Sequence, residues 1–230
     1  MSFRFKQFYI EDSKCAMKVG TDGVLLGCWA ETEDVRCQMS DVRILDVGTG
    51  SGLIARMMMQ RFPEADVEGI DIDEAAVEQA RENGVKAFVS RLQEWKKEGG
   101  YDLIVSNPPY FQNSLKNPDK GRELARHTDS LSYEELIDHS ARLLREGGQL
   151  ALILPADKEA EMRQIAASKN LFLTHVTRVY SKESKPARRV LLAFRYQISD
   201  ISWTEDTLVL EDEKGGRSTA YQELTKDFYL

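Results

Sequence analysis

Hydrophobic residues change their spacing along the chain from residue 43 onward, and this pattern predicts strands and helices in alternation. Apolar residues three or four positions apart predict helices at residues 53–58, 74–82, 132–144 and 158–169. Short apolar runs between them predict strands at residues 43–47, 67–72, 85–89, 101–106 and 149–154. Repeated strand–helix units favour an α/β fold with a largely parallel sheet and helices on both faces.

Local signals set some of these boundaries. Asp73 is a good N-cap for the second helix, and Ser132 with Glu135 forms a capping box at the start of the third. Gly147 and Gly148 are expected to end that third helix.

The last part of the chain departs from the alternation. Residues 172–180 and 189–196 predict two long strands with no helix between them, which favours an antiparallel hairpin at one edge of a seven-stranded sheet. Residues 201–210 are compatible with a further edge strand, and residues 219–227 with a short helix. We expect a single domain over residues 1–230, with an N-terminal extension or lid (1–40), a catalytic core (41–198) and a C-terminal edge segment (199–230).

Composition and charge narrow the class of protein. No run approaches the ~20 apolar residues of a membrane span, and the N-terminus does not look like a signal peptide. Three cysteines without a C-x-x-C spacing argue against disulfides and zinc. We therefore expect a cytoplasmic protein without a metal, a membrane or an obligate protein partner.

The formal net charge of -7 excludes a generally basic surface, so any nucleic-acid binding must use local patches. Two stretches concentrate positive charge and are either solvated loops or RNA-binding patches. They are Lys182, Lys185, Arg188 and Arg189, and Lys116, Lys120, Arg122, Arg126 and His127.

A glycine-rich loop, 48–52, follows the first strand of the alternation. Its G-x-G-x-G spacing places Leu53 where a dinucleotide-binding loop would have its third glycine, so a dinucleotide is disfavoured. Asp46 precedes Gly48 and Gly50, and a carboxylate there suits a ligand with an ammonium or sulfonium charge. Asp71, at the end of the next strand, is placed to bind a ribose diol.

The tetrapeptide Asn107-Pro108-Pro109-Tyr110 follows the strand at residues 101–106. The Asn107 side-chain carbonyl and the Pro108 main-chain carbonyl are two acceptors, which is what an amino group with two protons requires. Tyr110 can stack on a planar substrate. Because open α/β sheets bind ligands beyond the carboxyl ends of their strands, this tetrapeptide and the glycine loop are expected to face one cleft. A rigid structural turn is the alternative.

These motifs resemble the class I, Rossmann-like methyltransferases with an N-P-P-Y motif, which methylate adenine N6 or a glutamine amide. The runs 5–9 and 17–27, together with 125–127, 189–194 and 228–230, resemble the bacterial tRNA(Val) adenine-37 N6-methyltransferase family over nearly the full length.

The resemblance implies S-adenosylmethionine as cofactor and tRNA as partner. It implies that Lys18, Thr21 and Asp22 lie beside the methionine end of the cofactor, that Gly48 and Gly50 face it, and that Asp71 lies beside its ribose. Ile72 and Asn107 are further expected cofactor-binding residues. Enzymes of this kind often carry an Asp after the third strand that binds the cofactor's adenine, whereas Arg91 occupies that place here. Arg126, His127, Lys185, Arg188 and Arg189 are the expected RNA-binding residues.

The predicted activity is methyl transfer to N6 of an adenine in tRNA. Two alternatives remain at this point: a protein glutamine N-methyltransferase that uses the same tetrapeptide, and a binding protein that keeps the cofactor fold without turnover.

Overall fold

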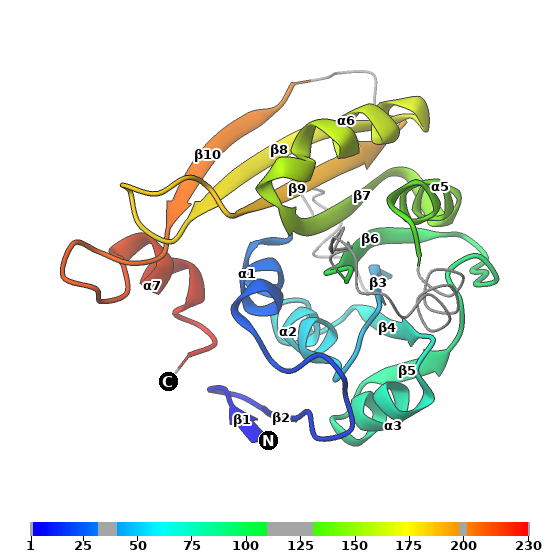
Figure 1. The fold of residues 1–230 in the computed structure, drawn as a ribbon. Helices are drawn as coiled ribbons and strands as arrows, with labels where there is room; N and C mark the ends of the chain where they lie inside the picture. Colours follow the sequence, from blue (N-terminus) through cyan, green and yellow to red (C-terminus); the bar gives the residue numbers. More distant parts are fainter. Residues whose placement is uncertain (1, 32–40, 110–130, 198–201, 230) are drawn as a thin grey trace, which may run out of the picture.

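The computed structural model describes residues 2–31, 41–109, 131–197 and 202–229. Its main feature is a twisted eight-stranded sheet with the strand order β10-β8-β9-β7-β6-β3-β4-β5 (Figure 1). Tyr110, Arg126 and His127, three of the predicted site residues, lie outside the described residues.

The strands of the sheet are β3 (Arg43–Val47), β4 (Asp66–Asp71), β5 (Lys86–Val89), β6 (Tyr101–Ser106), β7 (Leu144–Pro155), β8 (Leu171–Tyr180), β9 (Arg189–Tyr196) and β10 (Thr204–Val209). The helices are α1 (Thr21–Trp29), α2 (Leu53–Arg61), α3 (Glu74–Glu82), α5 (Tyr133–Leu143), the short η2 (Ala156–Lys158), α6 (Glu159–Ser168) and α7 (Thr219–Thr225). A separate small hairpin is formed by β1 (Ser2–Arg4) and β2 (Tyr9–Glu11).

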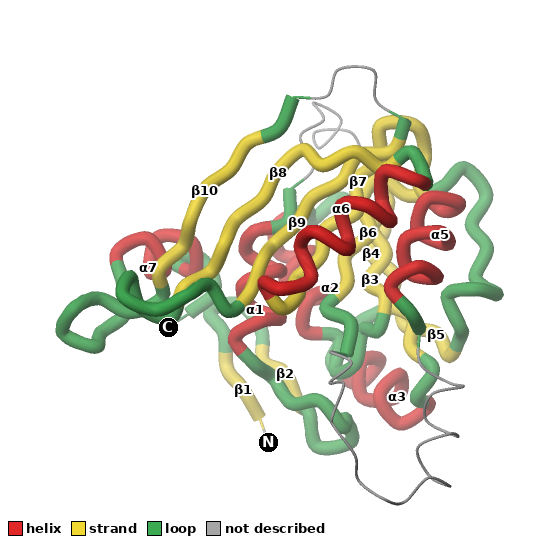
Figure 2. The backbone as a smooth tube through the Cα atoms, turned by 45° about the horizontal axis from the view of Figure 1, so that its top comes forward, coloured by secondary structure: helices red, strands yellow, loops and turns green. Residues whose placement is uncertain are grey.

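The helices cover the two faces of the sheet, because consecutive residues of each strand point to opposite faces. In β3, Ile44 belongs to the buried cluster under α1, α2 and α3, whereas Leu45 belongs to the cluster under α5 and α6. Figure 2 shows α5 and α6 lying across one side of the strands. The predicted α/β fold with helices on both faces is confirmed.

Neighbouring strands are parallel across the sheet from β5 through β4, β3 and β6 to β7. Strand β9 runs antiparallel to both of its neighbours, β7 and β8. The predicted antiparallel pair is confirmed, but it is not at the edge and the sheet has more than the seven strands expected. The reason is β10, which pairs in parallel with the outer side of β8 and buries Leu208 in the core.

The third predicted helix ends earlier than its glycines indicated. Helix α5 begins with the predicted capping box of Ser132 and Glu135 but ends at Leu143, and Leu144 already has extended backbone angles. Leu144 pairs with Tyr101 of β6, and Leu143 and Leu144 are both buried in the same cluster. Sheet pairing and burial of two leucines therefore override the local signal of Gly147, which adopts a φ of +75° beyond the helix.

The N-terminal segment contributes directly to the core. Phe5 and Phe8 pack in a buried cluster with Phe228 near the other end of the chain, and the Lys6 main-chain N–H donates to the Phe228 carbonyl at 2.9 Å. Helix α1 packs against α2 and buries Leu25 and Leu26 over the sheet. The division of the chain into extension, core and edge segment stays a prediction.

Candidate active site

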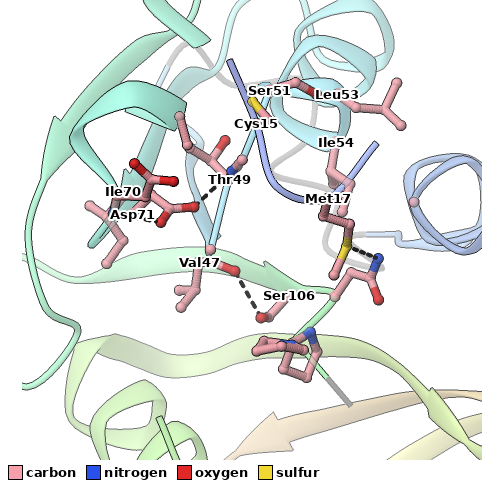
Figure 3. A pocket seen from close by; sticks show the side chains of 18 of the residues that line it. Cys15, Met17, Val47, Thr49, Ser51, Leu53, Ile54, Ile70, Asp71 and Ser106 are labelled. Atoms are coloured by element: carbon pink, nitrogen blue, oxygen red, sulfur yellow. Dashed lines mark hydrogen bonds between the residues drawn. The ribbon is translucent and has the colours of Figure 1, made fainter. Parts of the chain in front are cut away.

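A cavity of about 990 Å³ opens at the carboxyl ends of β3, β4 and β6, where the sequence placed the cleft. Figure 3 shows this cavity from close by. Its walls come from segments that are far apart in the chain: residues 15–23, 47–51, 53–54, 70–73, 76, 90–93, 106–109 and 131.

The glycine loop is fixed to the end of β4 by its own main chain. The N–H groups of Gly48 and Thr49 both donate to the Ile70 carbonyl, at 2.9 and 3.0 Å, and the Gly50 N–H donates to Asp71 Oδ2 at 2.9 Å. Gly48 and Gly50 have φ values of +72° and +54°, and a Cβ added to either would meet no atom within 4 Å. The loop therefore presents a bare backbone edge to the cavity, which leaves room for a ligand to approach closely.

Asp46 stabilises this loop from the buried side, away from the cavity. Its carboxylate is fully buried, and Oδ2 accepts from the Thr49 hydroxyl at 2.7 Å and from the Ala55 N–H at 3.1 Å. Burial raises the pKa of Asp46 to about 7, although the bonds from Thr49 and Ala55 act in the opposite direction. Asp46 does not line the cavity. The expected direct contact of its carboxylate with a cationic ligand is therefore not supported by this geometry.

Asp71 lies at the end of β4, as predicted, and its side chain faces the cavity (Figure 3). Oδ1 accepts a hydrogen bond from the Asp73 N–H at 3.0 Å, and Oδ2 accepts one from the Gly50 N–H. These two bonds fix the orientation of the carboxylate. Ile72 also lines the cavity and is 53% exposed. A carboxylate next to an exposed apolar side chain suits a ribose that carries a flat base.

Asn107, Pro108 and Pro109 also line the cavity, directly after β6. The Ser106 hydroxyl donates to the Val47 carbonyl at 2.8 Å, which ties this segment to the start of the glycine loop. The Asn107 amide nitrogen faces the sulfur of Met17 at 4.0 Å. The structure thus brings the two predicted motifs to one cavity.

The predicted N-terminal site residues also line the cavity, but they differ in what they bind. The Lys18 ammonium donates to the carbonyls of Asp12 at 2.7 Å, Ser13 at 3.3 Å and Cys15 at 2.8 Å. An ammonium has three donors, so Lys18 organises its own loop. Thr21 and Asp22 start α1 at the cavity wall.

The predicted RNA-binding residues of the β8–β9 connection have different environments. Arg189 Nε donates to Asp22 Oδ2 at 2.8 Å, so its side chain is paired at the edge of the cavity. Lys185 and Arg188 are exposed, and no carboxylate of the described part of the chain forms an ion pair with them. The connection follows β8 and therefore lies at the same edge of the sheet as the cavity.

Several wall residues were not predicted. Ser90, Leu92 and Gln93 line the cavity together with Arg91, the residue found where an Asp was expected. Cys15 and Met17 also line it. Met17 begins the second family-like run, but an apolar residue in a loop carries no charge or periodicity that would identify it as part of a site.

Neither a cluster of metal-ligating side chains nor a membrane-spanning helix is found among the described residues. Within residues 2–31, 41–109, 131–197 and 202–229, no three His, Cys, Asp or Glu side chains gather in a way that could hold a metal ion. Among the helices of these same residues, none has the length and apolarity needed to cross a membrane.

Solved structures with a similar fold include methyltransferases. The crystal structure of a predicted O-methyltransferase from Agrobacterium tumefaciens matches with a TM-score of 0.68 at 19% identity, over 90% of this chain and 96% of that one. A putative class I S-adenosylmethionine-dependent methyltransferase from Listeria monocytogenes matches with a TM-score of 0.59 at 17% identity, over 89% and 68% of the two chains. The fold is that of the class I methyltransferases.

Sequence comparison defines the family more closely. The sequence model of the methyltransferase small domain matches residues 32–179. The chain is 42% identical to the tRNA1(Val) (adenine(37)-N6)-methyltransferase of Phocaeicola vulgatus, over 99% of this chain and 97% of that protein. It is 44% identical to the protein of the same name from Parabacteroides distasonis, with the same coverage. The chain belongs to this methyltransferase family, and the resemblance predicted from the sequence is confirmed.

We expect Asp71→Ala to weaken binding of S-adenosylhomocysteine by roughly 1.5–3 kcal/mol, because a charge-assisted acceptor is lost and Gly50 loses its anchor. Asp71→Asn, which keeps one side-chain acceptor, should lose less. Calorimetric titration of the three proteins measures this. An unchanged affinity in Asp71→Ala would remove Asp71 from the site.

Asp46 predicts a pH dependence of stability. Its pKa is raised in the folded state, so between about pH 4 and pH 7 the folded protein keeps a proton that the unfolded chain has lost. The contribution of Asp46 to the free energy of unfolding therefore falls as pH rises through this window. Asp46→Asn cannot titrate, so the stability of wild type relative to this variant should decline from pH 4 to pH 7. Urea unfolding of both proteins at several pH values tests this, and a constant difference would contradict it.

Proposed function

We propose that this protein transfers the methyl group of S-adenosylmethionine to N6 of an adenine in tRNA, namely adenine 37 beside the anticodon of tRNA(Val). The observation that carries the proposal is the position of Asn107 and Pro108 on the wall of the cavity that the glycine loop and Asp71 also line. The shared name of relatives that align over nearly the full chain supports the choice of substrate.

The residues present fit the cofactor. The bare backbone edge of Gly48 and Gly50 admits a close ligand, and Asp71 offers carboxylate oxygen at the same wall. We assign the ribose to Asp71, a flank of the adenine to Ile72, and the methionine end to the wall formed by Thr21 and Asp22. Bound S-adenosylmethionine supplies an electrophilic methyl group on a sulfonium, and the protein supplies position and a dry surface.

Asn107 and Pro108 prepare the methyl acceptor. The Asn107 side-chain carbonyl and the Pro108 main-chain carbonyl each accept a hydrogen bond from the target amino group, one from each N–H. These two hydrogen bonds localise the nitrogen lone pair and direct it toward the methyl donor. The adenine must leave its stack to reach this point, and an anticodon loop lowers that cost because its bases are already partly unpaired.

The alternative substrate, a glutamine side-chain amide, also has two protons for these acceptors. The names of the relatives favour tRNA, and an intact Asn107-Pro108-Pro109 segment disfavours a binding protein without turnover. We further propose that the enzyme acts in the cytoplasm and requires neither a metal nor a protein partner.

The substrate is tested by methyl transfer from labelled cofactor into unmodified total tRNA and into protein, followed by nucleoside mass spectrometry. We expect N6-methyladenosine in tRNA from the wild type. Asn107→Ala should lose nearly all turnover while binding S-adenosylhomocysteine normally, because the lost acceptor acts on the amino group rather than on the cofactor. Label in protein glutamine and none in tRNA would overturn the substrate assignment.

A protein with a net charge of -7 must concentrate its contacts with RNA phosphates. The exposed Arg188 and Lys185 meet this need, whereas Arg189 is paired with Asp22. We expect Arg188→Glu to weaken tRNA binding and to flatten its salt dependence without changing affinity for S-adenosylhomocysteine. Arg189→Glu places a second carboxylate beside Asp22 and should weaken binding of both ligands. Filter binding at several salt concentrations, together with calorimetry, separates the two variants. Normal tRNA binding by Arg188→Glu would show that this loop is exposed to solvent and takes no part in RNA binding.

A further inference from the structure

Met17 is an apolar residue in an unusual place. It lines the cavity, it is 52% exposed, and its sulfur lies 4.0 Å from the Asn107 amide nitrogen. Figure 3 shows Met17 on the cavity wall with this contact drawn as a dashed line. An exposed thioether therefore lies next to the side chain to which we assign the methyl acceptor.

Hydrogen bonds within residues 12–19 fix the loop that carries Met17. Lys18, the next residue, binds the three carbonyls described above, and the Val19 N–H donates to Asp12 Oδ2 at 3.0 Å. The Cys15 N–H donates to the Asp12 carbonyl at 3.1 Å. These bonds fix the backbone on both sides of Met17.

Helix α3 holds the same loop from outside. The Asn83 side chain accepts from the Glu11 N–H at 3.0 Å and donates to the Glu11 carbonyl at 2.7 Å and to the Ser51 carbonyl at 2.8 Å. One turn earlier, Gln79 Oε1 accepts from the Ser13 hydroxyl at 3.2 Å and from the Lys14 N–H at 3.3 Å. Gln79 thus ties the loop to α3, and Asn83 ties the residue at the start of this segment, Glu11, to the Ser51 carbonyl of the glycine loop, so the position of Met17 is coupled to the cofactor wall.

A thioether sulfur can accept a hydrogen bond but cannot donate one. It therefore favours the orientation in which the Asn107 amide turns its NH2 group toward Met17. Because the amide is planar, its carbonyl oxygen then points away from the sulfur. The reversed orientation would bring two acceptors together at Met17 and would present a donor to an amino group that also donates.

We propose that Met17 is a positioning residue for methyl transfer, whose sulfur sets the orientation of the Asn107 amide so that Oδ1 accepts a hydrogen bond from the target amino group. This inference rests on the proposed function, because it assumes an amino group as methyl acceptor. Because Met17 acts through Asn107, replacing its sulfur should change turnover more than affinity for the cofactor.

Met17→Leu keeps the size of the side chain and removes the acceptor. We expect its kcat on unmodified tRNA to fall about fivefold, while KM for S-adenosylmethionine and the affinity for S-adenosylhomocysteine stay within about twofold of wild type. Met17→Gln, which offers a carbonyl acceptor, should retain more activity than Met17→Leu. Met59→Leu is the matched control, because Met59 packs against the core away from the cavity and should leave every quantity unchanged.

A second measurement does not depend on turnover. The side-chain amide of Asn107 gives a ¹⁵N–¹H signal that can be assigned by its loss in Asn107→Asp, and this signal should shift in Met17→Leu but not in Met59→Leu. A Met17→Leu variant with wild-type kcat, an unmoved Asn107 signal, or a loss of cofactor affinity as large as the loss of kcat would overturn the proposal. If the wild type fails to methylate tRNA, the proposed function fails instead, and the amide signal still decides whether Met17 orients Asn107.

Discussion

Three consecutive main-chain N–H groups, those of Gly48, Thr49 and Gly50, hold the glycine loop against the end of β4. This attachment requires β3 and β4 to be parallel neighbours in a fixed register, with Asp46 opposite Gly69. Gly69 has no side chain, and a Cβ there would lie 2.7 Å from Thr49 Oγ1, so the absence of a side chain lets Thr49 reach Asp46. The open edge of the loop and the direction of the Asp71 carboxylate both follow from this contact.

The other walls of the cavity are built onto that loop by single polar side chains. Ser106 ties the end of β6 to Val47, and Asn83 ties the N-terminal segment to Ser51. Arg189 joins β9 to the start of α1 through Asp22. Each of these bonds connects segments that are distant in the sequence, so the cavity is a product of the whole sheet rather than of one motif.

Local patterns predicted much of this structure. Ser132 with Glu135 located the start of α5, the glycine loop and Asp71 located one cavity wall, and the Asn-Pro-Pro segment located another. The sequence failed where distant contacts decide: the pairing of Leu144 with Tyr101 ended α5 early. Residues 201–210 were expected to allow a further edge strand, but the parallel pairing of that strand, β10, with β8 could not be foreseen, and it moves the antiparallel pair away from the edge. The partners of Lys18 and Arg189 could not be predicted either, because a charged side chain carries no sign of whether it will meet a ligand, its own backbone or a neighbouring carboxylate.

The packing of Phe5 and Phe8 against Phe228 has a consequence for the mechanical integrity of the cavity. These three side chains share one buried cluster, although they are far apart in the sequence. The chain continues from Phe5 and Phe8 into residues 15–23, which form a wall of the cavity. Damage to the helix that precedes Phe228 therefore removes support from this wall, so the site depends on a segment that contributes no residue to it.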